Sequence, residues 1–224
     1  MNVDTESVVY SRLEKTANAL RANNMEVFIV ENRQKAMEKT EELLSEGDRI
    51  GLGGSVTLNE CKITDLVRSK KYRFIDRYEA GLTAEQIRER HIEALSADVY
   101  ITSSNAVTEN GELYNVDGNG NRIAAIAYGP GKVIVVAGYN KITPDLKEAI
   151  MRVKRIAAPA NVKRLKIDGY CSKTGECISC KTENSEMSDG CSGQGRICCD
   201  YLISGYQREK NRIKVILVAE KLGY

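Results

Sequence analysis

The chain has 224 residues, with 33 Lys and Arg against 31 Asp and Glu, which gives a formal net charge of +2. A chain of this length buries roughly 70% of the surface that its unfolded form exposes, so it can form a full core without disulfide bonds. The nearly neutral balance disfavours a nucleic-acid partner or an anionic membrane surface, because both usually require a basic face.

Helical and strand patterns alternate through the first hundred residues. Apolar residues recur at helical spacing over 8–20, and we expect Asp4 or Thr5 to cap this helix. Further helices are predicted at 33–44, 58–68 and 83–97. Strands are predicted at 26–30, 72–75 and 99–103, and residues 49–57 are predicted as a strand that runs into a glycine turn.

The second half adds strands around 112–115, 122–128, 132–137 and 214–219, and a helix over 145–156 that follows Pro144. Strands that alternate with helices of this length are typical of βαβ units and a mainly parallel sheet. We therefore predict one α/β domain over 1–224. A cysteine-rich excursion at 171–199 interrupts it before the last strand.

The sequence also predicts the compartment. Its N-terminal segment has no apolar signal-peptide region, and no apolar run approaches the ~20 residues of a membrane span. We expect a cytoplasmic protein without a membrane partner, in which thiols stay reduced.

A glycine-rich turn follows the predicted strand at 49–52. Gly53 and Gly54 would permit close backbone approach, and Ser55 and Thr57 add hydroxyl groups, so the turn can hold a phosphate or carboxylate. It lacks the Lys-Ser/Thr pair of a P-loop and the full dinucleotide motif. The alternative is a tight strand-to-helix turn with a capping hydroxyl group.

Residues 103–122 are dense in Asn, Asp and Gly and follow a predicted parallel strand. Such side chains favour turns, but the carboxyl ends of parallel strands are also where open α/β sheets bind ligands. Asn105, Asp117 and Asn119 are candidate ligand-binding residues here. Glu109 is the candidate general acid or base, and Arg122 the candidate partner of a substrate carboxylate or phosphate.

Two other reactive side chains have ordinary explanations. His91, the single histidine, lies among charged residues of a predicted helix and is expected to be a solvated surface residue. Cys61 is expected to be a small buried apolar residue.

Six of the seven cysteines fall within 171–199. Such a cluster serves as a metal or iron–sulfur site, a redox pair or a set of disulfides. Disulfides are the least favoured of these in a reducing compartment.

Several motifs together make the chain resemble the LUD-domain family of lactate-utilisation proteins. They are GGS-x-T at 53–57, S-N-A-x-T-x-x-G at 104–111, N-x-D-G-x-G-N-R at 115–122, G-x-N-K at 138–141 and L-V-x-E-x-L-G-Y at 217–224. The resemblance implies a three-layer fold similar to the sugar-phosphate isomerase and CoA-transferase group. It also implies a link to the oxidation of lactate, beside iron–sulfur partner proteins, and adds Lys141 to the candidate ligand-binding residues.

The chain is similar to stand-alone members that end in C-x5-C-x2-C followed by R-I-C. This resemblance implies a four-thiol set formed by Cys171, Cys177, Cys180 and Cys198. The spacing is closer to a plant-type ferredoxin pattern than to a zinc ribbon. An iron–sulfur cluster, zinc and no metal all stay open, and Cys191 and Cys199 are extra to the pattern.

The sequence and the family resemblance together lead to three functional hypotheses. The first is a protein that supports lactate utilisation by binding a small anionic metabolite, with a C-terminal cysteine site. The second is a non-catalytic subunit of an iron–sulfur oxidoreductase. The third is a transferase or isomerase that acts on a phosphorylated or CoA-linked substrate. A homodimer is compatible with each.

Overall fold

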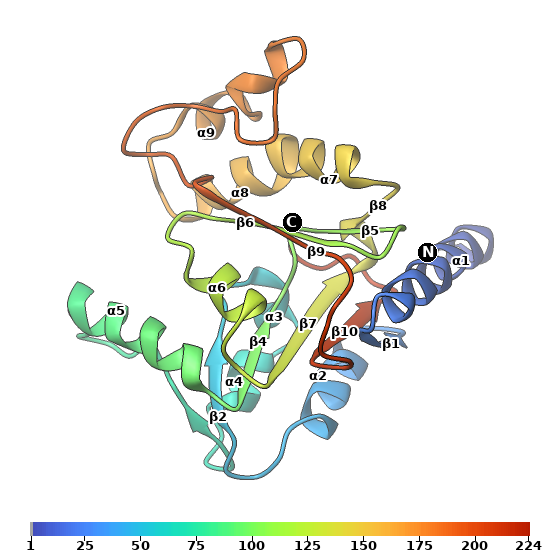
Figure 1. Ribbon diagram of the computed structural model, residues 1–224, viewed down its shortest axis with the longest axis vertical. Helices are drawn as coiled ribbons and strands as arrows, with labels where there is room; N and C mark the ends of the chain where they lie inside the picture. The colour runs from blue at the N-terminus through green and yellow to red at the C-terminus, as the bar shows by residue number, and fades with distance from the viewer. Residues whose placement is uncertain (1) are drawn as a thin grey trace.

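The computed structural model describes residues 2–224, in which six parallel strands form the central sheet, in the order β1-β10-β7-β4-β2-β3 (Figure 1). The strands are β1 (Glu26–Val30), β2 (Arg49–Leu52), β3 (Arg73–Phe74), β4 (Val99–Thr102), β7 (Lys132–Gly138) and β10 (Ile213–Val218). Every pairing in this sheet is parallel.

Alternation along the central strands divides the core between the two faces of the sheet. In β7, Val133 and Val135 face one cluster, while Ile134 and Val136 face the other, because successive side chains of a strand point to opposite sides. The cluster around Ile134 and Val136 is completed by apolar residues of three helices, α2 (Arg33–Glu42), α3 (Val56–Glu60) and α4 (Ile63–Val67). The cluster around Val133 and Val135, here called the first cluster, is completed by apolar residues of α1 (Val3–Ala22) and α6 (Asn121–Ala127).

A smaller sheet packs beyond the first cluster, in the order β8-β5-β6-β9. Its strands are β5 (Ala106–Thr108), β6 (Leu113–Asp117), β8 (Ile142–Thr143) and β9 (Asp200–Ser204). Helices α7 (Leu146–Arg152) and α8 (Ala158–Arg164) cover its far side, around Tyr114 and Val153. The structure confirms the predicted three-layer α/β class with a mainly parallel sheet.

A π-helical turn over Val153–Ala157 joins α7 to α8, so the helix predicted at 145–156 continues to Arg164. Pro159 has no N–H group to donate to the carbonyl of residue 155, which removes one α-helical hydrogen bond at this point. Such π turns are common at functional sites.

Two local predictions were wrong. Residues 122–127 of the segment predicted as a strand at 122–128 belong instead to helix α6. The Asp117 carboxylate accepts hydrogen bonds from the backbone N–H groups of Arg122 and Ile123 (2.9 and 3.0 Å), and the alanine residues of this segment favour a helix. The first helix is capped not by Asp4 or Thr5 but by Asn2, whose side chain accepts from the N–H group of Thr5 (2.8 Å).

The cysteine-rich segment lies between α8 and β9 and contains the short helix α9 (Tyr170–Thr174). Figure 1 shows it in orange, beyond α7 and α8 and away from the central sheet. Helix α5 (Ala84–Glu93) projects from the left side of the molecule in this view. No helix within residues 2–224 combines the length and apolar character that crossing a membrane requires.

Candidate functional site

A cleft of about 500 Å³ lies at the carboxyl ends of β2 and β4. These strands are neighbours, but the chain leaves β2 toward β3 and leaves β4 toward β7, on the other side. Adjacent strands whose connections diverge form a topological switch point, where open α/β sheets bind ligands. The loops after β2 and β4 form one wall, and the α7–α8 unit with the cysteine-rich segment forms the other.

The structure brings most of the predicted site residues together at this cleft. Its lining includes Gly54, Ser55, Thr57, Asn105, Asp117, Asn119, Arg122 and Lys141. Gly53 lies just behind the wall, where an added Cβ would be 2.5 Å from Thr102 Oγ1. Glu109 is not among the lining residues.

Glu109 is held by helix α1 instead. Its carboxylate accepts from Arg12 Nε (2.8 Å) and Lys15 Nζ (2.7 Å). The bond to Lys15 lowers the pKa of Glu109, burial opposes that effect, and the bond to Arg12 lowers the pKa further. A carboxylate with two cationic partners, away from the cleft, ties α1 to the smaller sheet.

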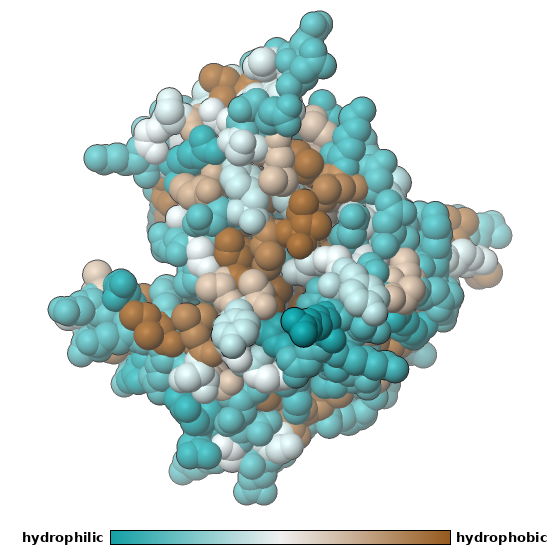
Figure 2. All heavy atoms as spheres, viewed as in Figure 1, coloured by the Kyte–Doolittle hydropathy of each residue, from teal (hydrophilic) through white to brown (hydrophobic). Residues whose placement is uncertain are grey.

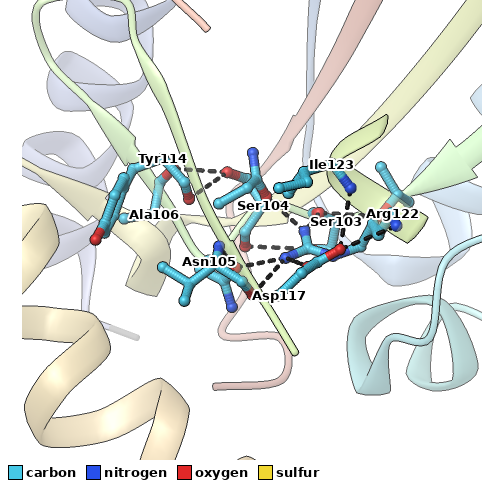
Figure 3. A network of polar contacts seen from close by, with 11 residues as sticks. Ser103, Ser104, Asn105, Ala106, Tyr114, Asp117, Arg122 and Ile123 are labelled. Atoms are coloured by element: carbon cyan, nitrogen blue, oxygen red, sulfur yellow. Dashed lines mark hydrogen bonds and ion pairs between the residues drawn. The ribbon is translucent and has the colours of Figure 1, made fainter. Parts of the chain in front are cut away.

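Arg122 is committed to its own loop (Figure 3). Its Nη2 lies 2.7 Å from Asp117 Oδ1 and 2.7 Å from Asn105 Oδ1, and Nη1 donates to Asn115 Oδ1 (2.5 Å). The guanidinium also donates to the backbone carbonyls of Ser103 and Val116. Since its donors are used within the protein, Arg122 organises the Asn-rich segment and does not offer a free fork to a ligand.

The turn after β2 positions a different arginine. An added Cβ at Gly54 would lie 2.6 Å from Arg77 Nη2, so the glycine leaves room for this guanidinium over the turn. Ser55 caps the short helix α3, with Oγ 3.4 Å from the N–H group of Leu58. The turn is therefore a tight strand-to-helix connection with a capping hydroxyl group, which is one of the two alternatives left open by the sequence. It also leaves room for the Arg77 guanidinium.

Arg77 is held by two neutral groups. Its Nη1 lies 2.7 Å from His91 Nε2, and Nη2 donates to the Tyr78 hydroxyl (2.6 Å). Its buried Nε has no hydrogen-bond partner within residues 2–224. Burial, followed by the Arg77 charge, lowers the pKa of His91, so His91 acts as a neutral partner of Arg77 and not as a freely solvated residue.

The cleft carries an excess of positive charge. Four cationic residues on its wall form no ion pair within the described chain: Arg77, Lys141, Arg164 and Arg196. Arg164 donates to Asn161 and to the Tyr224 hydroxyl, and Arg196 to backbone carbonyls and the Tyr201 hydroxyl. Asp117 is the only Asp or Glu side chain on the described wall, and Arg122 already neutralises it.

Four cysteines line a second, much smaller cavity of about 30 Å³: Cys171, Cys177, Cys191 and Cys198. Cys180 does not line it. Burial raises the pKa of Cys171 and raises that of Cys198 to about 12. In residues 2–224, all seven thiols are free and no three Cys, His, Asp or Glu side chains stand at metal-binding spacing.

The two cavities share a wall. Cys198 and Arg196 line both, so the cysteine cavity adjoins the cationic cleft. From the sequence, the cysteines appeared to belong to a region separate from the ligand site. The geometry instead places one thiol between the two.

Three of the cations have no local signal in the sequence. Arg77, Arg164 and Arg196 stand in unremarkable contexts among 33 basic residues. They become neighbours only because the chain returns to the switch point from β3, α8 and the cysteine-rich segment. The motifs beside them are the indirect signal. Gly54 of the glycine-rich turn leaves room for Arg77, and Arg196 lies two residues before Cys198 of the cysteine pattern.

Fold and site define an α/β protein with a cationic cleft at a switch point of its parallel sheet. The LUD domain family matches residues 13–218, and the chain belongs to that family. No curated protein matches it.

Three solved structures show remote similarity. A DUF162 family protein from Deinococcus radiodurans is 14% identical, with a TM-score of 0.47, over 96% of this chain and 98% of that one. The eIF2B beta of Chaetomium thermophilum is 18% identical, with a TM-score of 0.35, over 52% of this chain and 44% of that one. The eIF2B delta of the same organism is 16% identical, with a TM-score of 0.35, over 53% and 50%.

Proposed function

We propose that this LUD-domain protein binds a small carboxylate of the 2-hydroxy acid or 2-oxo acid class in the cationic cleft, and so supports lactate utilisation in the cytoplasm. The observation that carries the proposal is the set of cations without carboxylate partners on the cleft wall. The family membership supplies the metabolic context.

Uncompensated charge favours an anionic ligand for a simple reason. Cations that share a partly enclosed cleft repel one another, and a bound carboxylate relieves that repulsion while it gains charge-assisted hydrogen bonds. The cleft, at about 500 Å³, lies within the usual range of small-molecule sites. Its wall also offers neutral polar groups, such as Asn119 and Asn161, to orient a hydroxyl or carbonyl group.

Arg164 is the best placed to receive the carboxylate. It lines the cleft, and its bonds to Asn161 Oδ1 (2.8 Å) and Tyr224 Oη (2.8 Å) use Nη2 and Nε. Within the described chain, its Nη1 has no hydrogen-bond partner. Arg77, with its unpartnered Nε, is the second candidate.

The first test is a thermal-shift comparison of L-lactate and pyruvate with the uncharged analogue lactamide. Ligands that bind the folded state raise the melting temperature, so both acids should raise it and lactamide should not. Arg164→Gln should abolish most of the shift. Arg208→Gln, an exposed arginine away from the cleft, is the matched control and should retain it. Equal shifts for lactamide and lactate would overturn the proposal.

We also propose a metal centre at the cysteine-rich segment, an iron–sulfur cluster or a zinc ion. Four thiols around one cavity support it. The cavity, at about 30 Å³ against about 500 Å³ for the cleft, is small, which suits a single ion more readily than a cluster. Thiolates would hold the metal, and the thiols would have to approach one another further to bind it. An iron–sulfur centre would supply electron transfer beside the cleft.

The cavity also suggests a ligand set that differs from the one implied by the family pattern, because Cys191 lines it and Cys180 does not. Anaerobic purification with iron, sulfide and zinc analysis tests this. Cys191→Ser should lower the bound metal, whereas Cys180→Ser should leave it unchanged. Retention by Cys191→Ser with loss by Cys180→Ser would restore the set implied by the family pattern. No metal in the unmodified protein would contradict the centre itself.

An accessory role is the second candidate. Figure 2 shows an apolar band across the face on which β9 lies, and β9 is the edge of the smaller sheet, with Ile203 40% exposed. An exposed edge strand can pair with another chain, which suits an iron–sulfur oxidoreductase or a second copy of this chain. If the purified protein binds lactate but oxidises no 2-hydroxy acid with an artificial acceptor, the accessory role gains. The transferase or isomerase role stays a prediction from the family resemblance.

A further inference from the structure

Lys141 is a buried amine at the base of the cationic cleft. It lies in the turn Tyr139–Lys141 after the central strand β7 and is only 4% exposed, yet it lines the cleft. Neighbouring bonds fix the turn, because the Asn140 carbonyl accepts from Arg152 Nε (3.1 Å) and Asn140 Oδ1 accepts from the N–H group of Leu222 (3.0 Å).

In the part of the chain that the structure describes, no carboxylate forms an ion pair with this lysine. Within residues 2–224, its Nζ has one hydrogen-bond partner, Ser103 Oγ at 2.9 Å. The nearby Glu60 carboxylate accepts from the N–H group of Gly223 (2.7 Å) and forms no ion pair with Lys141. The charges of Arg152 and Arg122 act on this amine more strongly than the opposing charge of Glu60.

These surroundings disfavour the charged form of the amine. Burial, followed by the charges of Arg152 and Arg122, lowers the pKa of Lys141 to about 7. A desolvated lysine beside another cation is a recognised arrangement for an amine that attacks carbonyl groups.

We propose that Lys141 is a carbonyl-reactive amine that forms an imine with a 2-oxo acid bound in the cleft, and that Ser103 moves protons during the reaction. This inference rests on the proposed function, because the cationic wall must hold the carboxylate of the acid. The reactive carbonyl carbon is adjacent to that carboxylate, and Lys141 lines the same cleft as the cations.

The chemistry balances without an outside oxidant or reductant. The Lys141 Nζ lone pair attacks the C2 carbonyl carbon, and the carbonyl oxygen takes a proton to give a carbinolamine. Loss of that hydroxyl group as water then forms the carbon–nitrogen double bond, and both protons of the amine leave with the oxygen. Ser103 Oγ, 2.9 Å from Nζ, can accept a proton from nitrogen and donate one to oxygen.

Reductive trapping tests the inference directly. The full-length protein is incubated at pH 7 with pyruvate and cyanoborohydride, and the modified lysines are mapped by mass spectrometry. An amine of pKa about 7 is half unprotonated at pH 7, and an ordinary lysine is unprotonated roughly a thousand times less often. We expect Lys141 to be modified at least about tenfold faster than any other lysine. The comparably buried Lys154, which does not line the cleft, should carry no adduct.

Variants separate the roles of the two residues. Lys141→Met should remove the preferred adduct, with thermal melting as the check that it folds. Ser103→Ala should form the adduct several-fold more slowly than the unmodified protein, with an altered pH profile. L-lactate, which has no carbonyl group at C2, should compete with trapping and form no adduct.

The outcomes distinguish this inference from the proposed function. If pyruvate raises the melting temperature but the adduct is spread over surface lysines, the imine inference fails and the carboxylate site stands. If neither pyruvate nor lactate affects melting, the carboxylate site itself fails. If Lys141→Met does not fold, the map of the unmodified protein still decides, since a preferred adduct at Lys141 supports the inference and its absence contradicts it.

Discussion

The Arg122 guanidinium and the Asp117 carboxylate form a nearly buried ion pair, with Nη2 and Oδ1 2.7 Å apart and side-chain exposures of 12% and 7%. The same carboxylate accepts from the backbone N–H groups of Arg122 and Ile123, the second and third residues of α6. One acidic side chain therefore both neutralises the arginine and starts the helix that supports the cleft.

Asp117→Asn should lower the free energy of unfolding by about 3 kcal/mol, because it leaves the Arg122 charge buried without its partner. Urea unfolding measures the change. Asp168→Asn is the matched control, since its bond to Lys173 lies on the surface with side-chain exposures of 80% and 69%. It should cost less than about 0.5 kcal/mol. Equal losses in the two variants would contradict the role given to Asp117.

Glu109→Gln should weaken folding and leave ligand affinity unchanged. Its carboxylate joins α1 to the smaller sheet through Arg12 and Lys15, which are partly exposed, so we expect a loss of about 0.5–1 kcal/mol. Urea unfolding and lactate titration measure the two properties. A loss of lactate affinity with full stability would return Glu109 to the site.

Gly54→Ala should weaken carboxylate binding without unfolding the protein. The added methyl group would lie 2.6 Å from Arg77 Nη2, the end of a flexible side chain, which can move aside. Loss of one charge-assisted contact corresponds to roughly tenfold in affinity. Gly131→Ala is the control, because an added Cβ there meets nothing within 4 Å. Unchanged affinity in Gly54→Ala would show that Arg77 does not contact the ligand.

His91 should make the stability of the folded protein depend on pH. Burial and the Arg77 charge lower its pKa below the ordinary value of 6.5. As the pH falls, the unfolded chain therefore takes up a proton before the folded chain does. The contribution of neutral His91 to the free energy of unfolding is present above pH 6.5 and is lost as the pH falls through the lowered pKa of the folded state. Unfolding measured from pH 7.5 to pH 5 should show this loss, and His91→Gln should flatten it. An identical slope in both proteins would contradict the assignment.

The sequence was informative where the local pattern determined the structure. Runs rich in β-branched residues predict strands of the parallel sheet, and the Asn-rich segment contributes Asn105, Asp117 and Asn119 to the cleft wall. The family motifs identified the family that the comparison with known sequences confirms.

The sequence was less informative where contacts between distant segments determine the local structure. Residues 122–128 have strand-like composition, but capping by Asp117 makes them a helix. The strands β5, β8 and β9 are short and are defined by pairing between segments far apart in the chain. For the same reason, the sequence favoured Arg122 as the ligand partner, although Asp117 and Asn105 already occupy its guanidinium.

Isothermal titration of the purified protein with L-lactate, repeated with lactamide and with Arg164→Gln, tests the cationic cleft most directly. We expect a Kd for lactate below about 1 mM, with binding lost for lactamide and at least roughly tenfold weaker in Arg164→Gln. Lactate and lactamide binding with equal affinity, or no lactate binding at millimolar concentration, would contradict it.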